Sequence, residues 1–273
     1  MNMSQLVKAE NWNTFILNSY NYQVLNKYGL VRGGRMGIAD RRQREKEQRK
    51  TEILDAAERL FFSRSYEDVS MDEIAREVEL NKATLYLYFK NKETIFATIV
   101  LRGIHILKEK YMECMEKQVP GIVKVALMGQ AYYQFSQEYP DYLRMIHFYG
   151  SERFSKENPC TAEIGKGYGT CRMILRDAIQ EGIDDGTIRA DLDPFLTSMY
   201  LMISFMGILS MENKWKLVIE VEGFSYEQFT SEFFRFIIPA ISSGESSHNM
   251  DVKDFAAFGF FLTEPVVTEK RKR

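Results

Sequence analysis

Residues 70–96, SMDEIAREVELNKATLYLYFKNKETIF, constrain the fold of this chain most, because they hold two helix starts a short turn apart. Ser70 and Glu73 have the spacing of a capping box, which satisfies backbone amides at a helix start. The next apolar residues recur at i, i+3, i+4 and i+7 and predict one buried helical stripe: Met71, Ile74, Ala75 and Val78. After a two-residue turn, Asn81 is a favourable cap for a second short helix. Such a pair of helices is typical of the helix-turn-helix, whose second helix enters the DNA major groove.

The second helix has an apolar side and a side suited to DNA. Leu85 and Phe89 lie four residues apart, so we expect both to face the core. The other positions then face outward: Lys82, Ala83, Thr84, Tyr86, Leu87 and Tyr88. Lysine and tyrosine can donate to phosphate oxygens, and Thr84 can hydrogen-bond a base edge or contact a thymine methyl group. Asn91 caps a third helix, at whose start Lys92 is a further candidate for a phosphate contact. The spacing alone also fits a small helical hairpin with a solvated lysine edge.

These residues, with the helix before them, resemble the DNA-binding domain of the TetR family of transcriptional regulators over roughly residues 45–100. The matching stretches are Ile53–Ala57 with Leu60-Phe61, Ser70–Ala75, Thr84–Phe89 and Lys92-Glu93. The resemblance implies that Tyr86 and Lys92 contact phosphates, and that Lys82–Thr84 and Tyr88 approach bases or the nearby backbone. The family often has glycine where this chain has Glu79. If that position needs a positive φ, Glu79 is strained by about 1 kcal/mol.

A basic run precedes the helix-turn-helix. Residues 41–50, RRQREKEQRK, contain six basic and two acidic residues. Family members often place a basic arm against the minor groove or the backbone, which makes three residues candidates if this part is disordered until it binds: Arg41, Arg42 and Arg44. The alternative is a solvated helix start. The net charge of −2 excludes a general polycation, so DNA affinity has to come from a local positive face.

The remaining chain predicts helices with short connections, over 92–117, 122–138, 141–149, about 161–185, 194–211 and 225–241. Residues 194–211 form an uncharged run of 18 residues, a length at the lower edge of what a membrane-spanning helix needs. Serines and threonines within this segment favour instead a helix buried on two sides, by its own domain and by a partner subunit. The helix at 225–241 adds an apolar stripe: Phe229, Phe233, Phe236 and Ile237. Two such helices from each chain predict a four-helix homodimer interface, as in the family, and hence a near-palindromic DNA site.

Large apolar and amphipathic residues lie on the helices that enclose the effector pocket in the family. The candidates are Tyr132, Tyr133, Phe135, Met145, Phe148, Tyr149, Tyr168, Met173, Met202 and Phe205. Methionine adapts to irregular apolar shapes and a tyrosine hydroxyl can orient a polar group, so the set suits a small apolar or aromatic effector. Each residue taken singly is better explained as ordinary core, and only the set as a whole indicates an effector pocket.

The sequence gives no sign of catalysis, metal or cofactor. Its three cysteines are odd in number and lack close metal-ligand spacing, which indicates a reduced cytoplasmic protein. The three histidines are scattered, and we find no nucleophile–base pair. A glycine-rich phosphate loop follows a β-strand, and no strand is predicted before Gly165, Gly167 and Gly169. We therefore expect a loosened helix start there and not a phosphate loop.

We therefore expect an all-α protein in four parts: an N-terminal extension over 1–40, a helix-turn-helix domain over 41–96, a helical effector-binding and dimerisation domain over 97–241, and a C-terminal extension over 242–273. Residues 31–35 could be encoded by a sequence resembling a ribosome-binding site, so translation is hypothesised to begin at Met36. In the C-terminal extension, Phe255–Leu262 is an apolar patch expected to dock on the body, and Lys270–Arg273 is a basic tip.

The function that these observations predict is a dimeric repressor of double-stranded DNA operators, released when an unknown small-molecule effector tilts the helix at 92–117. The alternative is a DNA-bound interaction module that recruits a protein partner through its C-terminal extension without any ligand.

Overall fold

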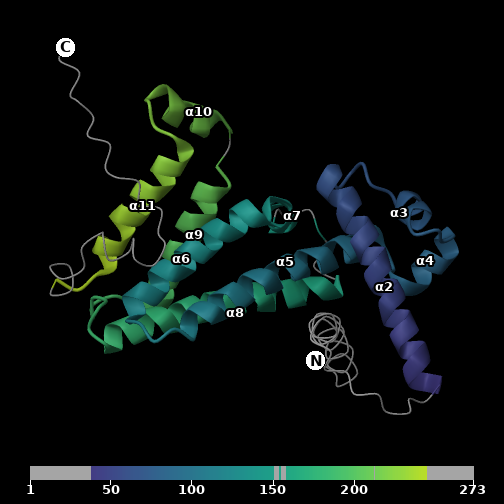
Figure 1. Cartoon of the computed structure of the whole chain (residues 1–273), viewed down its shortest axis with the longest axis horizontal. Helices are drawn as coiled ribbons and strands as arrows, with labels where there is room; N and C mark the ends of the chain where they lie inside the picture. Colours follow the sequence, from purple (N-terminus) through teal and green to yellow (C-terminus); the bar gives the residue numbers. More distant parts are fainter. Residues whose placement is uncertain (1–37, 151–153, 155–157, 212, 245–273) are drawn as a thin grey trace. The chain divides into compact units, whose positions relative to one another are not determined.

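We analysed a computed structural model of the chain, which describes residues 38–150, 154, 158–211 and 213–244. Within these residues lie ten α-helices, α2 to α11, and no strand apart from an isolated bridge between Ile188 and Ser242 (Figure 1). The predicted all-α class is confirmed. The expectations for Met36, for the patch at 255–262, for the basic tip at 270–273 and for most of the two extensions lie outside the described residues.

The helices form two compact units, each described here by itself. The first unit contains the described residues up to His105 together with 145–167, and the second contains 106–144 and the described residues from 168. The helices α5 (Lys92–Met115) and α8 (Pro159–Asp184) contribute residues to both units. The first unit is therefore not one continuous stretch of sequence, and the domain limits expected from the sequence remain a prediction.

The first unit is built on α2 (Ile38–Ser63), α3 (Met71–Glu77) and α4 (Lys82–Tyr88), with the start of α5. Figure 1 shows α3 lying against both α2 and α4. The capping box of Ser70 and Glu73 is present, and the Asn81 side chain accepts a hydrogen bond from the Thr84 amide. The core of this unit is made of apolar side chains from all four helices, fully buried in each case: Ile53, Phe61, Ile74, Leu85, Phe89 and Ile95.

The start of α2 corrects one condition of the sequence analysis. The arginine arm required residues 41–44 to be disordered, whereas the structure places them within α2, which begins at Ile38. Side-chain pairs four residues apart stabilise this turn of helix, including Arg41 with Glu45 at 2.8 Å and Gln43 with Glu47 at 2.5 Å. Arginine, lysine, glutamine and glutamate are also good helix formers, so local preference agrees with the observed helix.

The turn between α3 and α4 has a positive φ at Glu79, the position where the family often has glycine. Glu79 has a φ of 55°, in the left-handed region, and is the one non-glycine residue with a positive φ among those described. A side chain in this region costs roughly 1–2 kcal/mol, because its Cβ crowds the following carbonyl oxygen.

We predict that Glu79→Gly stabilises the protein. Relief of strain exceeds the extra entropy that glycine gives the unfolded chain, so the free energy of unfolding should rise by about 0.5–1 kcal/mol. The matched control is Glu77→Gly at the last residue of α3, which should lower stability by up to about 1 kcal/mol. Urea denaturation measures both, and equal losses in the two variants would show that the turn is unstrained.

The second unit contains α6 (Gly121–Glu138), α9 (Pro194–Leu209), α10 (Asn213–Val221) and α11 (Tyr226–Ile241), with parts of α5, α7 (Pro140–Gly150) and α8. Within it, α6 packs against α9 and α11. Asp193 caps α9 ahead of Pro194, as its position in the sequence indicates. The helix α10 was not predicted, because its large apolar side chains are exposed and form no buried stripe: Trp215, Leu217, Val218 and Val221.

No single helix in the described part of the chain is long and apolar enough to cross a membrane. The pair α9 and α10 meets that test only when taken together, and an 80° bend separates the two helices.

Candidate DNA-binding surface

The helix α4 separates its two sides as the spacing predicts. Leu85 is completely buried and Phe89 is 1% exposed, whereas Leu87 is 79% and Tyr86 44% exposed. Lys82 and Ala83 are also exposed, and Thr84 and Tyr88 are half-buried. Four of the six residues predicted to face DNA are thus exposed, and Thr84 and Tyr88 lie at the edge of the core contacts. We call the six together the α4 face: Lys82, Ala83, Thr84, Tyr86, Leu87 and Tyr88.

Lys82 is held by a carboxylate of the neighbouring helix. Its Nζ donates to Asp72 Oδ2 at 2.8 Å, and both side chains remain about half exposed. The hydrogen bond and the charge of Asp72 raise the pKa of Lys82. The one lysine of α4 is therefore charged and paired with a carboxylate.

Lys92 has a different environment from the one expected of an open phosphate ligand. Its Nζ donates to the main-chain oxygens of Tyr66 at 2.7 Å and Val69 at 2.8 Å, and lies 4.2 Å from the centroid of the Tyr66 ring. Partial burial lowers the pKa of Lys92. Lys92 thus holds the loop between α2 and α3, so its replacement would perturb that loop as well as any phosphate contact.

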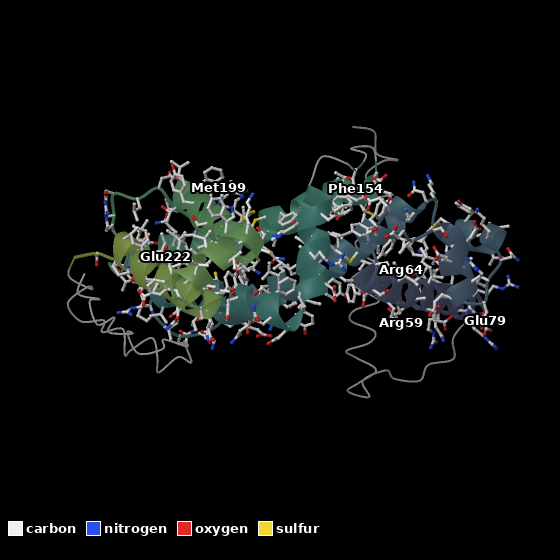
Figure 2. The ribbon with its side chains drawn as sticks, turned by 90° about the horizontal axis from the view of Figure 1, so that it is seen from above. Arg59, Arg64, Glu79, Phe154, Met199 and Glu222 are labelled. Atoms are coloured by element: carbon white, nitrogen blue, oxygen red, sulfur yellow. The ribbon has the colours of Figure 1, made fainter. Side chains whose placement is uncertain are left out.

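Several charged residues that the sequence did not single out position α2 and α3. Arg64 donates to Glu73 Oε1 at 2.7 Å, and this bond, with those from Ser70, lowers the pKa of Glu73 to about 2. Arg102 donates to two residues of α2, to Asp55 at 2.8 Å and to Glu58 at 3.0 Å. Figure 2 labels Arg64 on the first unit. The partners in these pairs lie 9 to 47 residues apart in the chain. No periodic spacing links residues so far apart, so the pairs could not be predicted from a single sequence.

The arginines at the start of α2 lie on an exposed helical surface. Arg41 is paired with Glu45, while Arg42 and Arg44 are exposed. A role for these three residues in DNA contact remains a prediction, now for a helix and not for an extended arm.

Three of the ten effector candidates lie in the first unit: Met145, Phe148 and Tyr149. There the rings of Phe148 and Tyr149 join an aromatic cluster with Tyr66, Phe96 and Phe154. Phe154, labelled in Figure 2, is 4.5 Å from Tyr149 and 5.1 Å from Tyr66 between ring centroids. Burial raises the pKa of Tyr66 to about 12. The cluster joins the loop after α2 to the end of α7, so in this structure Phe148 and Tyr149 contribute to the packing of the first unit.

The other seven candidates lie in the second unit, in environments that differ. Tyr132 and Tyr168 are neighbours of Cys171, and burial raises the pKa of all three, that of Cys171 to about 12. Phe205 packs instead on the rings of Phe233 and Phe234, at 5.4 and 5.1 Å. Phe135 is buried, Tyr133 and Met202 are half-buried, and Met173 is 47% exposed.

No three histidine, cysteine, aspartate or glutamate side chains gather as a possible metal site among the described residues.

Known proteins place this arrangement in a family. Residues 53–99 match the family model described as bacterial regulatory proteins, tetR family. The chain is 27% identical over 170 residues to the uncharacterized HTH-type transcriptional regulator YhgD of Bacillus subtilis (strain 168), an alignment covering 59% of this chain and 82% of that protein.

Two solved structures share the fold. The transcriptional regulator FadR from Bacillus subtilis, in complex with stearoyl-CoA, matches with a TM-score of 0.55 at 19% identity, over 70% of this chain and 98% of that one. AibR, in complex with isovaleryl coenzyme A and operator DNA, matches with a TM-score of 0.54 at 20% identity, over the same shares. Residues 53–99, which contain the helix-turn-helix of α3 and α4, therefore form the DNA-binding domain of a TetR family transcriptional regulator.

Proposed function

We propose that this regulator is a dimeric repressor, which a small effector with an apolar or aromatic group releases from a near-palindromic operator. The observation that carries the DNA part is the α4 face: Leu85 and Phe89 anchor the helix inside the unit, and Leu87 and Tyr86 are exposed. In this account the α4 face enters the major groove, and the exposed arginines of α2 contact the DNA backbone.

The dimer is supported by where the second unit exposes apolar side chains. Large exposed residues gather on α9, α10 and α11 and on the turn before α11: Phe195, Leu196, Tyr200, Ile203, Trp215, Leu217, Val218, Val221, Phe224 and Phe236. Removal of such side chains from water stabilises an assembly, and a second copy of the chain can cover them with the same surface. The side chains of α9 divide accordingly, since Leu201 and Phe205 are buried within the unit while Tyr200 and Ile203 are exposed.

The effector class is supported by two kinds of observation. The second unit holds buried tyrosines and large apolar candidates, among them Tyr132, Tyr168 and Phe135. The structures of FadR and AibR contain stearoyl-CoA and isovaleryl coenzyme A, which are thioesters with apolar acyl groups. We infer that an acyl-coenzyme A is the first effector to test on this chain. Its binding would move α5, which contributes residues to both units, and so change how two α4 helices meet one DNA duplex.

The test is a DNA-release titration with acyl-coenzyme A thioesters of increasing chain length, with free coenzyme A as the matched control. A differential binding energy of about 3 kcal/mol would weaken operator affinity roughly 100-fold. We expect release by at least one thioester and none by free coenzyme A. If aromatic acids release the DNA instead, the effector class changes to aromatic. Unchanged DNA affinity at saturating concentrations of ligands that raise the melting temperature would reject effector control.

A further inference from the structure

The pair formed by Asp72 and Lys82 lies at the start of both helices of the helix-turn-helix. Asp72 is the second residue of α3 and Lys82 is the first residue of α4. Their oxygen and nitrogen atoms are 2.8 Å apart, and each side chain keeps about half of its surface exposed. The bond therefore occupies the only lysine of α4 in the DNA-free protein while leaving it within reach of solvent and of DNA.

A negative charge at this place opposes DNA binding in two ways. A phosphate that contacts Lys82 either displaces the Asp72 carboxylate or lies beside it, and both alternatives cost free energy. This cost weakens binding to nonspecific DNA most, because neutralisation of phosphates supplies essentially all of the affinity for nonspecific DNA. At an operator, base contacts add affinity that does not depend on Lys82.

We propose that Asp72 is an affinity-setting residue, which holds Lys82 in the DNA-free protein and thereby lowers binding to nonspecific DNA. The inference rests on the proposed placement of the α4 face in the major groove. It assigns to a carboxylate of α3 a role in discrimination between operator and bulk DNA, although Asp72 need not touch a base itself.

The test compares binding of Asp72→Asn and the wild type to a random-sequence 30-base-pair duplex at several salt concentrations. We expect about fivefold tighter binding, since one exposed ion pair is lost in each subunit of a dimer. The plot of log affinity against log salt should also steepen, by up to about 0.9 for each Lys82 that gains a phosphate. The gain should be smaller on the operator than on random DNA. Glu77→Gln is the matched control, because it removes one carboxylate from the same helix and breaks the pair with Arg59; it should change affinity less than twofold.

Asp72→Asn in a Lys82→Ala background shows whether Asp72 acts through Lys82 or directly by its own negative charge. If Asp72 acts through Lys82, Asp72→Asn has no effect there. An equal gain in both backgrounds would show that Asp72 acts by its own charge and would overturn the proposal. If Lys82→Ala weakens DNA binding but Asp72→Asn changes nothing, the proposal for Asp72 fails, while the result still supports DNA contact by the α4 face. If neither variant changes affinity while thermal denaturation shows both folded, the placement of the α4 face itself is wrong.

Discussion

Leu87→Glu should weaken operator binding at least 100-fold without destabilising the protein. Leu87 is the most exposed large apolar residue in the described part of the first unit, at 79%, and lies at the centre of the α4 face. A glutamate there brings one negative charge per subunit against the phosphates and base edges, and the proposed dimer would carry two. A loss of about 1.4 kcal/mol in each subunit gives the 100-fold effect.

The substitution isolates DNA contact because little of the leucine is buried. We expect the melting temperature to change by less than about 2 °C, since an exposed position contributes little to stability. Leu87→Gln separates charge from the loss of the leucine and should cost less than Leu87→Glu. Gln134→Glu, on an exposed position of α6, adds the same charge elsewhere and should leave operator affinity within twofold. Fluorescence anisotropy measures all three, and equal weakening by the last variant would point to net charge as the cause.

Gly121→Ala should destabilise the second unit by about 3 kcal/mol or more. A Cβ at residue 121 would lie 2.1 Å from the amide nitrogen and 2.3 Å from the Cα of Gly182, so α6 and α8 approach at two glycines. Both neighbouring atoms belong to the backbone, so no side-chain rotation relieves the overlap. The Gly121 amide also donates to Asp185 Oδ2 at 2.7 Å, and separation of the helices would break this bond.

The matched control for this prediction is Gly165→Ala in α8. No atom outside its own helix neighbourhood lies within 4 Å of a Cβ built there, so alanine should stabilise the helix by about 0.5–1 kcal/mol. Calorimetry should show the melting temperature of Gly121→Ala lowered by about 10 °C and that of Gly165→Ala slightly raised. Equal, small shifts in both variants would mean that α6 and α8 are not in close contact at residue 121.

These two glycines show what a single sequence can and cannot predict. Gly121 lies between two predicted helices and was expected only to separate them, and Gly165 was expected only to loosen a helix start, because a single sequence does not distinguish a close helix contact from local flexibility. Residues whose role depends on neighbours within a few positions were predicted well, as with the Ser70 capping box, the Asn81 cap and the burial of Leu85 and Phe89.

Roles that depend on distant partners were not predicted. Phe148 and Tyr149 carry the right chemistry for an effector pocket, yet they lie in the aromatic cluster of the first unit with Tyr66 and Phe154. Lys92 matches a phosphate-binding position of the family and was predicted to contact a phosphate, and it also donates to two carbonyl oxygens of the loop after α2. In each case the partners of the side chain could be found only in three dimensions.

The most direct test of the account is selection of DNA ligands from a random pool of duplexes by the purified wild-type protein, in parallel with Leu87→Glu. We predict that the wild type enriches one motif with two related halves in inverted orientation, as two α4 helices of a twofold dimer require, and that Leu87→Glu enriches none. Absence of any enriched sequence with folded wild-type protein, or the same enrichment by both proteins, would contradict the claim that the α4 face recognises DNA.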